Sequence, residues 1–391
     1  MQVATTGDAQ GESAAKRRRV AIFRMRLFQP SETFVATEAM NLERYEPCFV
    51  GFERAQQIDV GRPVLLASGP APKLLTTAGF ASPFSGLEAL GPSLVHAHFA
   101  VDGRFAVPIV RKLGLPLVVT LHGYDVQIAD RAILMSGKYA EMAAVVGRSG
   151  LIKRASAFLC VSEAIKRRAI AKGFPEEKLV VHYLGVNTTA LQPVPTEEPG
   201  LIVQVGRLVE KKGVRYLLEA MQTLKAREVD ARAVIIGGGE QLEALAALAR
   251  SLGVDDRVSF KGATPHAETL DWMRRAAVIA APSVTAANGD AEGLPIVVLE
   301  AGALGKPLIG FASSGIPEAV DSGRTGMLVP EREAGQLAAA LETVLTNEAL
   351  RRAQGEAARA AIVANFDIHV STRRLERLYD EAIARHPARR A

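Results

Sequence analysis

The sequence predicts an α/β protein of two doubly wound domains, each a parallel sheet covered by helices on both faces. Three observations predict this class. A chain of 391 residues is too long for one hydrophobic core and suits two or three domains. Short apolar runs, often β-branched, alternate along it with longer segments of helical period. Residues 186–200 contain three prolines and no apolar period, so we expect a linker between two such halves.

The first half holds seven apolar runs that we expect to be strands. They are apolar throughout, which is typical of a parallel sheet buried on both faces. Amphipathic stretches between them, such as 103–113 and 162–172, are expected to be helices. The expected strands are 20–25, 47–52, 63–67, 93–99, 116–123, 157–162 and 178–185.

The same pattern restarts after the linker. Ligands of doubly wound sheets bind at the carboxyl ends of the strands, so a cleft between the two domains is the expected site. The expected strands are 201–207, 231–239, 257–262, 276–283 and 306–311. The expected helices are about 213–227, 240–252, 266–275, 294–304, 334–346, 348–364 and 367–385.

These patterns divide the chain into five segments. Residues 1–17 are expected to be a disordered basic tail, and 18–190 the N-terminal Rossmann-like domain. Residues 191–200 form the linker proper, and 201–365 the C-terminal Rossmann-like domain. We expect 366–391 to be a C-terminal helix that packs back on the N-terminal domain.

Composition limits the class of protein and its compartment. Hydrophobic residues make up 48% and charged residues 23%, as in ordinary soluble proteins, and no apolar run approaches the roughly 18 to 20 residues that cross a bilayer. The basic run 16–19 is followed by an apolar run, 20–23, that is too short for a signal peptide. Cys48 and Cys160 stand singly, which fits a reducing compartment and excludes a disulfide framework or a cysteine zinc site. We expect a cytoplasmic protein.

The positive charge belongs to the first half of the chain. Residues 1–195 hold 23 Lys and Arg against 16 Asp and Glu, a net of +7, whereas residues 196–391 hold 24 against 26, a net of −2. This asymmetry favours an anionic partner for the first half, such as a phospholipid surface, a diphosphate-linked substrate or nucleic acid. A solvated basic face explains it equally well.

The segment 289–310, GDAEGLPIVVLEAGALGKPLIG, carries two carboxylates in an apolar setting. Pro295 suits a first helical turn, so we expect a helix that begins at 293–295 and runs to about 304. Its first N–H groups form an anion site at the positive end of the helix dipole. Glu292 and Glu300 are eight positions apart, which at about 1.5 Å per residue spans about 12 Å, comparable to a nucleotide sugar.

We interpret these groups as a site for a nucleotide sugar. Glu292 accepts hydrogen bonds from sugar hydroxyls, the N–H groups of Gly293 and Leu294 face a diphosphate, and Glu300 accepts the paired ribose hydroxyls. The alternative is that Glu292 caps the helix and Glu300 is an exposed helix residue. That alternative is weakened because a carboxylate without a partner is unfavourable in an otherwise apolar helix.

The segment 204–220, QVGRLVEKKGVRYLLEA, places Arg207 at the end of a strand and Lys212 just before the next helix. A planar guanidinium and a flexible ammonium at this spacing suit a diphosphate clamp. Such a pair neutralises charge on a leaving phosphate without a metal ion. The alternative is a surface loop that happens to be basic.

Five motifs in this order resemble the GT4 family of retaining glycosyltransferases with the GT-B fold, over about residues 20–385. The resemblance implies that Arg207 and Lys212 bind the donor diphosphate, Glu300 the ribose and Glu292 the transferred sugar. It implies no metal and no cofactor, with a nucleotide diphosphate sugar as co-substrate. It also implies acceptor binding by the N-terminal domain and nucleotide-sugar binding by the C-terminal domain. The motifs are the Arg207 and Lys212 spacing, the Glu292 and Glu300 spacing, GGGE from 237, SGIPEAV from 314 and GVNTTALQP from 185.

The segment 118–125, VVTLHGYD, matches the family position where a histidine reaches the cleft near the donor sugar. His122 is therefore expected to be catalytic together with Glu292, orienting the acceptor or stabilising an oxocarbenium-like sugar. The alternative is a buried histidine satisfied by its own loop. Asp125 is expected to be its partner or an acceptor contact.

Two further segments of the first half resemble cleft positions of the family. In VHAHF, His96 and His98 point to the same face of a strand, and we set a metal site aside because no acidic cluster lies nearby in the sequence. The family often shows a similar motif close to the cleft, so His98 is expected to line it. In QPSETF we expect Ser31 as an N-cap, with Glu32 and Thr33 in a first turn aimed at the cleft.

The SETF segment departs from the Gly-Gly phosphate loop of many GT4 members. It resembles the bacterial subset that builds exopolysaccharide or lipopolysaccharide, of the colanic-acid type. Residues 137–154 mix apolar and basic side chains and are expected either to rest on anionic lipid near a polyprenyl-diphosphate acceptor, or to pack as an amphipathic helix on their own sheet.

We therefore expect a metal-independent hexosyltransferase at the inner face of the cytoplasmic membrane, with a glycan acceptor and no nucleic-acid partner. A nucleotide-sugar epimerase on a similar fold is the main alternative, because it shares donor binding but needs no acceptor. A two-lobed solute binder and a pyridoxal-phosphate phosphorylase are further alternatives. The donor base and sugar, the acceptor and the oligomeric state stay open.

Overall fold

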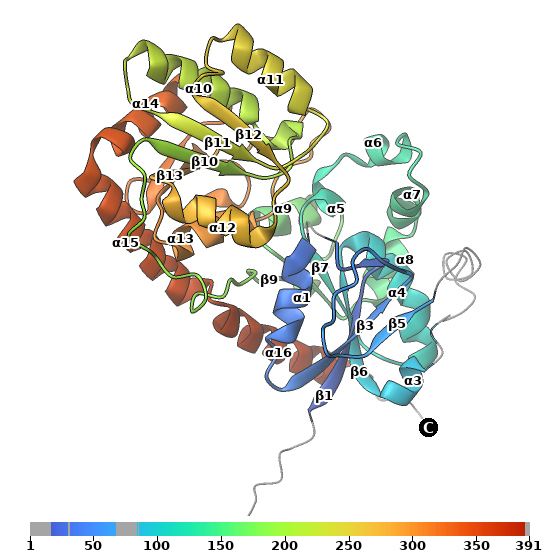
Figure 1. Cartoon of the computed structure of the whole chain (residues 1–391). Helices are drawn as coiled ribbons and strands as arrows, with labels where there is room; N and C mark the ends of the chain where they lie inside the picture. Colours follow the sequence, from blue (N-terminus) through green and yellow to red (C-terminus); the bar gives the residue numbers. More distant parts are fainter. Residues whose placement is uncertain (1–16, 30–31, 68–83, 85, 388–391) are drawn as a thin grey trace, which may run out of the picture.

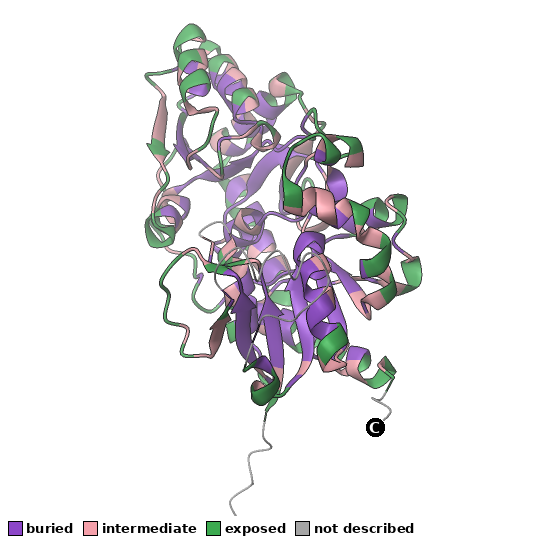
Figure 2. Ribbon diagram, turned by 90° about the vertical axis from the view of Figure 1, so that its right-hand side faces the viewer, coloured by how far each residue is buried: buried purple, intermediate pink, exposed green. Residues whose placement is uncertain are grey.

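The computed structural model describes residues 17–29, 32–67, 84 and 86–387. The predicted tail, residues 1–17, therefore lies outside the described residues except for Arg17. The described chain forms two lobes, each built around its own parallel sheet (Figure 1). The central strands of both sheets are buried, and exposed residues lie mainly on the covering helices, the loops and the sheet edges (Figure 2).

The N-terminal lobe contains a seven-stranded parallel sheet in the order β5, β3, β1, β6, β7, β8, β9. Its seven strands coincide with the seven predicted apolar runs. All five residues of β7 are buried, because helices cover both faces of the sheet. The strands are β1 (Arg18–Phe23), β3 (Tyr45–Gly51), β5 (Val64–Leu66), β6 (Pro92–His98), β7 (Leu117–Leu121), β8 (Ala157–Cys160) and β9 (Leu179–Val181).

Two hydrophobic clusters lie on the two faces of this sheet. Helix α4 packs on one face through residues such as Phe105 and Ile109. Helix α1 and the C-terminal helix α16 pack on the other, through residues such as Val35 and Leu375. A small parallel pair that was not predicted, β2 (Arg26–Leu27) and β4 (Glu53–Arg54), lies beside the sheet. The helices of this lobe are α1 (Thr33–Met40), α3 (Leu87–Leu90), α4 (Ala100–Leu113), α5 (Tyr124–Gln127), α6 (Asp130–Leu134), α7 (Tyr139–Val146), α8 (Arg148–Arg154) and α9 (Glu163–Ala171).

The C-terminal lobe contains a six-stranded parallel sheet in the order β12, β11, β10, β13, β14, β15. Five of its strands were predicted, and the edge strand β15 was not. The strands are β10 (Leu201–Val205), β11 (Arg232–Ile236), β12 (Val258–Gly262), β13 (Val278–Ala281), β14 (Leu308–Phe311) and β15 (Gly326–Val329). The helices are α10 (Val214–Ala226), α11 (Leu242–Ser251), α12 (His266–Arg275), α13 (Ile296–Ala303), α14 (Ala334–Thr346) and α15 (Glu348–Asn365).

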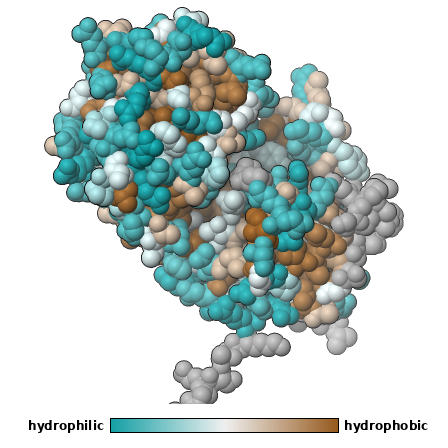
Figure 3. All heavy atoms as spheres, in the orientation of Figure 1, coloured by the Kyte–Doolittle hydropathy of each residue, from teal (hydrophilic) through white to brown (hydrophobic). Residues whose placement is uncertain are grey.

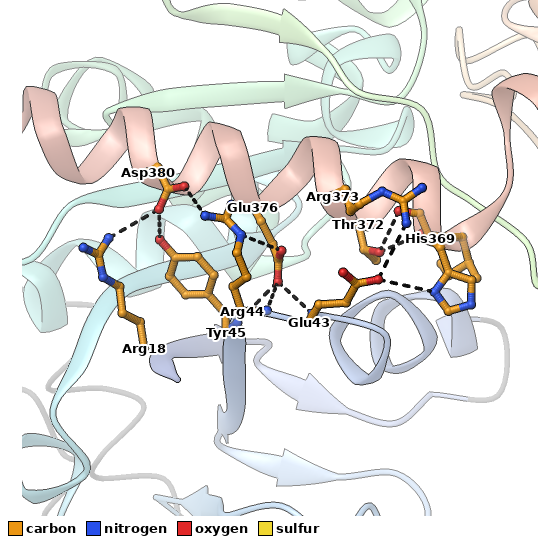
Figure 4. Close-up of polar contacts among 10 residues, drawn as sticks. Arg18, Glu43, Arg44, Tyr45, His369, Thr372, Arg373, Glu376 and Asp380 are labelled. Carbon is orange, nitrogen blue, oxygen red and sulfur yellow. Dashed lines mark hydrogen bonds and ion pairs between the residues drawn. The ribbon is translucent and has the colours of Figure 1, made fainter. Parts of the chain in front are cut away.

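The last helix, α16 (Ile368–Arg385), leaves the C-terminal lobe and packs on the N-terminal lobe. Figure 4 shows the polar side of this contact. The buried Glu376 carboxylate accepts the backbone N–H groups of Glu43 at 2.8 Å and Arg44 at 2.6 Å. Tyr45 donates its hydroxyl to Asp380 at 2.7 Å. These bonds fix α16 against the start of β3.

Among the described residues, none of the helices has the length and apolar character needed to cross a membrane.

Candidate active site

A turn at the edge of the C-terminal sheet leads into helix α13. The helix begins at Ile296 with Pro295 as its N-cap, one to three residues later than predicted, because Pro295 itself has extended backbone angles. Glu292, Gly293 and Leu294 form the turn that precedes it. Glu292 and Leu294 are buried, so this turn lies inside the molecule near the N-terminus of a helix.

Glu292 is 8% exposed, and its Oε1 lies 3.0 Å from Nζ of Lys212. The two groups form an ion pair inside the molecule. Burial acts to raise the pKa of Glu292, but the positive charges of Lys212, Lys211 and Arg207 outweigh it and hold the pKa below its usual range. The carboxylate is therefore ionised at neutral pH and can accept a hydroxyl.

The end of β10 positions the lysine of this pair. A Cβ on Gly206 would lie 2.8 Å from Cε of Lys212, so the glycine leaves room for the lysine chain. Lys212 ends a short 3₁₀ turn, and Gly213 follows it with φ +62°. Arg207 follows Gly206 and is exposed. The structure thus places both predicted clamp residues at the carboxyl edge of the sheet.

The second glutamate of the motif lies on α13 and has a partner that the sequence did not reveal. Glu300 is 9% exposed, and its Oε1 lies 2.7 Å from Nε2 of His266, the first residue of α12. The hydrogen bond to Glu300 raises the pKa of His266. The sequence predicts a strand at 257–262 and a helix from 266, which puts His266 at the carboxyl edge of the sheet, where ligands bind. This position is the signal that could have identified His266 as a site residue.

The N-terminal lobe contributes His122, which follows β7 and meets the Glu292 turn. A Cβ on Gly293 would lie 2.1 Å from the His122 carbonyl oxygen, so the two backbones are in contact. Gln127 of α5 donates from Nε2 to the Glu292 carbonyl oxygen at 2.8 Å. The structure therefore brings the predicted residues of the two lobes together. Gln127 was not predicted, because a glutamine in a short helix carries no signal of this contact.

His98 does not line the cleft as predicted. It is 1% exposed and lies beneath His122, with its Nδ1 3.1 Å from His122 Nε2 and the two rings stacked. His96 lies deeper, bonded to Tyr379 and Thr120. The correction has a simple cause, because β6 is central in the sheet and α16 covers the face on which both histidines lie.

Asp125 is a structural residue, and the prediction that it contacts an acceptor is corrected. It is buried, and its two oxygens accept the backbone N–H groups of Ala100 at 3.0 Å and Gly123 at 2.9 Å. Desolvation is the main influence on its pKa, which is raised. Asp125 therefore holds the turn after His122 against the start of α4.

The predicted turn at 31–33 is also corrected. Helix α1 begins at Thr33 with Glu32 at the N-cap, and no side chain caps it. The Glu32 carboxylate instead pairs with Arg24, whose Nη1 also lies 2.6 Å from Asp102. Thr33 takes its place in the first turn as predicted, and Ser31 lies outside the described residues.

A group with metal-ligand chemistry does occur, although none was expected from the sequence. Glu38, His96 and His98 are all buried, and each offers one atom that could bind a metal. These three atoms lie within 4.8 Å of one another. Glu38 comes from α1, far from VHAHF in the sequence, which is why no acid was expected there. The two ring nitrogens of His96 already lie 2.7 Å from Tyr379 and Thr120, so the described side chains satisfy it without a metal.

A cavity of about 520 Å³ lies between the lobes beside the Glu292 turn. In Figure 3 the surface is hollowed between the C-terminal lobe and the projecting helices α6 and α7. Gln127 reaches from the cavity wall to the Glu292 carbonyl. The cavity is lined by Val126, Gln127, Ala129, Asp130, Arg168, Ala171, Lys172, Ala287, Asn288 and Gly289.

Solved structures of known proteins share this two-lobed architecture. Anabaena Alr3699/HepE in complex with UDP and glucose superposes with a TM-score of 0.73 at 17% identity, over 93% of this chain and 100% of that one. Sucrose-phosphate synthase from Thermosynechococcus elongatus superposes with a TM-score of 0.75 at 19% identity, over 94% and 100%. At this identity the likeness shows the fold, which is GT-B.

Sequence comparisons identify the family. Residues 34–190 match the model "Glycosyltransferase Family 4" and residues 189–361 match "Glycosyl transferases group 1". The amylovoran biosynthesis glycosyltransferase AmsK of Erwinia amylovora is 32% identical over 297 residues, 72% of this chain and 69% of that protein. A protein of Salmonella typhimurium assigned as the colanic acid biosynthesis glycosyltransferase WcaL is 33% identical over 251 residues, 63% of this chain and 59% of that protein. The match thus spans about three fifths of the length of WcaL. The chain belongs to family 4 of the glycosyltransferases.

Proposed function

We propose that the protein is a retaining glycosyltransferase that moves a hexose from a nucleotide diphosphate sugar to a glycan acceptor. The acceptor is lipid-linked, and the reaction belongs to bacterial exopolysaccharide or lipopolysaccharide biosynthesis. One observation carries the proposal. The ion pair of Glu292 and Lys212 lies before the N-terminus of α13, in contact with the turn of His122 from the other lobe.

The charges at this edge suit the donor. Lys212 and Arg207 supply positive charge for the diphosphate, together with the positive end of α13. Glu300 accepts the ribose hydroxyls once His266 turns aside or shares its hydrogen bond. Glu292 accepts sugar hydroxyls with its carboxylate, beside the ammonium of Lys212. Both glutamates are ionised or hydrogen-bonded acceptors, which is what hydroxyl recognition needs.

The reaction breaks the bond between the anomeric carbon and the phosphate oxygen and forms one to an acceptor oxygen. The proton of the acceptor hydroxyl leaves with the nucleotide diphosphate or to solvent. Lys212 and Arg207 stabilise the negative charge that develops on the leaving phosphate, so no metal ion is required. The His122 carbonyl lies against Gly293 from the other lobe, and we assign the His122 imidazole to the positive charge that develops on the sugar.

Relatives support a hexose donor and leave its base open. Alr3699/HepE is solved in complex with UDP-glucose. A relative in Mycolicibacterium smegmatis, 31% identical over 289 residues, is named a GDP-mannose-dependent phosphatidylinositol monomannoside mannosyltransferase. The family models and the relatives named above are transferases, so nothing here supports the epimerase alternative.

Helices α6 and α7 project from the N-terminal lobe, and in this proposal they contact the inner face of the cytoplasmic membrane. Met135, Tyr139 and Val146 are 74%, 62% and 78% exposed, although their neighbours pack on α4. Lys138, at the start of α7, pairs with Glu141 and adds positive charge for anionic lipid, as does the exposed Lys153 of α8. The alternative for residues 137–154 was an amphipathic helix that packs on its own sheet, and this segment contains two helices, α7 and α8, joined at Gly147.

A transfer assay tests the proposal. The protein is incubated with UDP-glucose, UDP-galactose or GDP-mannose and with lipid-linked glycans extracted from bacterial membranes, with and without EDTA. We expect nucleotide diphosphate release that requires acceptor, a product with the donor's anomeric configuration by NMR, and no loss with EDTA. An inverted product would refute retention, and release or interconversion of sugar without acceptor would refute transfer.

Vesicles of phosphatidylglycerol and phosphatidylcholine test the membrane contact. The wild type is expected to float with anionic vesicles and to be released by salt, whereas a variant with Met135→Ser and Tyr139→Ser stays behind. Flotation of both proteins to the same extent would assign the contact to another surface.

A further inference from the structure

A column of imidazoles runs from the candidate active site into the N-terminal lobe. His122 lies at the surface of the contact between the lobes, and His98 lies beneath it with a ring nitrogen at 3.1 Å. His96 stacks on His98 with ring centroids 4.3 Å apart. Both inner rings are buried. The orientation of the outermost ring thus depends on groups beneath it that never meet solvent.

Both members of the contacting pair are neutral. Burial lowers the pKa values of His98 and His122 well below the usual range, and the charge of Arg24 lowers them further. A hydrogen bond between two neutral imidazoles needs one N–H donor and one lone-pair acceptor. The proton position on His98 Nδ1 therefore decides whether His122 Nε2 donates or accepts. It also decides whether His122 Nδ1 carries a proton or a lone pair.

Buried groups hold His98 in place from three sides. Arg24 donates from Nη1 to the His98 carbonyl oxygen at 3.0 Å. His96 supports the ring from below and is itself anchored by Tyr379 of α16 and by Thr120. A carboxylate oxygen of Glu38 lies within 4.8 Å of a ring nitrogen of His98, close enough to favour a proton on that nitrogen.

We propose that His98 is a positioning residue that fixes the ring orientation and tautomer of His122, with Glu38 setting the proton on His98. The proposal rests on the proposed function, in which His122 faces the donor sugar. His98 touches no substrate, so it acts only through His122. In this arrangement the imidazole meets the sugar in one protonation form throughout the working pH range.

The hydrogen bonds of Glu38 and His96 explain this cluster better than a metal ion does. Glu38, His96 and His98 have ligand types that bind zinc, but His96 would have to break its bonds to Tyr379 and Thr120 to offer a nitrogen. Glu38 also has a protein partner, since its Oε1 lies 3.1 Å from His182 Nε2. His96 and Glu38 Oε1 therefore both have protein partners.

The kinetic test uses His98→Leu, with Leu94→Ala as the control. Both positions are buried on β6 and on the same face of the sheet, but only His98 bonds to His122. We expect His98→Leu to lower kcat about 10- to 100-fold with the donor KM unchanged, which is the size of effect known for the outer hydrogen-bond partners of metal-ligating histidines. His98→Asn places an amide where Nδ1 stood and is expected to restore most of kcat. An equal loss of kcat in His98→Leu and Leu94→Ala would reduce His98 to packing and overturn the proposal.

A spectroscopic test does not depend on activity. With ¹⁵N-labelled histidine, the two ring-nitrogen shifts of His122 report its tautomer, and His122→Ala assigns them. We expect one tautomer in the wild type and in His98→Asn, and a mixture in His98→Leu and in Glu38→Gln. An unchanged His122 spectrum in His98→Leu would overturn the inference even where transfer is intact, whereas full activity of His122→Ala would overturn the proposed role of His122. If the purified protein contained stoichiometric zinc, the cluster would be a metal site and the inference of a hydrogen-bonded network would be wrong.

Discussion

Two neighbouring lysines take different partners although they share one short turn. Lys211 Nζ lies 3.1 Å from Asp290, and Lys212 Nζ lies 3.0 Å from Glu292. Asp290 is partly exposed, whereas Glu292 is buried beside the start of α13. Only the second pair therefore stands where a donor diphosphate would lie.

Replacing Lys212 by alanine is expected to weaken binding of the donor nucleotide by about 10- to 100-fold, the equivalent of about 1.5 to 3 kcal/mol for a hydrogen bond to a charged group. Isothermal titration calorimetry with the nucleotide diphosphate measures this. Lys211→Ala is the matched control, and we expect a change of less than about threefold from it, because Lys211 pairs with the partly exposed Asp290 and not with Glu292 beside the start of α13. Similar losses in the two variants would show that the turn contributes only general positive charge.

The His266 and Glu300 pair makes stability depend on pH. Its hydrogen bond raises the pKa of His266 in the folded state, so the stabilisation is present below the ordinary histidine pKa of about 6.5 and is lost as pH rises through the raised value. The melting temperature of His266→Ala should therefore fall further below that of the wild type at pH 6 than at pH 9. In a Glu300→Gln background the difference should no longer vary with pH. A gap that grows toward pH 9 would contradict the pairing.

Residue types and spacing were enough to expect Lys212 near Glu292 and to place Glu300 on the helix that follows, because each stands in a local motif. Their roles in donor binding stay predictions. Residue types and spacing were not enough for Glu38, which reaches His98 from a helix 60 positions earlier in the chain. Nor did they separate His98 from His122, since two histidines at strand ends look alike until the covering helix is known. Contacts between distant elements are what the sequence left open.

At the scale of elements, continuous apolar runs identified all seven strands of the N-terminal sheet. Strand β15 was missed because Gly326–Val329 is only four residues long and begins with glycine, so it gives little β signal. It exists because it pairs with β14 at the edge of the sheet. The start of α1 was misplaced because Glu32 is engaged by Arg24, so its carboxylate is not available as a cap.

The clamp between α16 and β3 gives a prediction for an element (Figure 4). Glu376 accepts backbone N–H groups that have no strand partner, so Glu376→Ala is expected to destabilise the protein by about 2 to 5 kcal/mol. Thermal unfolding followed by circular dichroism measures it. Glu381→Ala on the same helix is the control, because Glu381 pairs with Arg385 at the surface. Equal small shifts in both would mean that α16 is held by its apolar face alone.

At the scale of the molecule, the two lobes meet through small residues. Beyond Gly293, a Cβ on Gly315 would lie 2.9 Å from Cβ of Ser162 in the N-terminal lobe. Glu318 adds a polar link, since its carboxylate accepts the N–H groups of Glu163 at 2.7 Å and Ala164 at 2.9 Å. These contacts let the donor edge and His122 share one site.

Gly293→Ala is expected to hold the lobes apart. Its Cβ would meet the His122 carbonyl, a backbone atom that cannot rotate away, so we expect transfer to fall by more than about 100-fold and the radius of gyration to increase. Small-angle scattering and the transfer assay report the two effects. Gly335→Ala, where a Cβ meets nothing within 4 Å, is the control and should change neither. Full activity in Gly293→Ala would show that the contact is not part of the working state.

The central claim is that a nucleotide diphosphate sugar binds between Glu292 and Glu300 at the start of α13. The measurement that tests it most directly is a thermal-shift panel of UDP, GDP, ADP and their sugar conjugates against the metal-free wild type and Glu300→Ala. A ligand well above its dissociation constant raises the melting temperature by mass action. The account predicts that one nucleotide family stabilises the wild type and not Glu300→Ala. Equal stabilisation of both proteins, or none at millimolar concentrations, would contradict it.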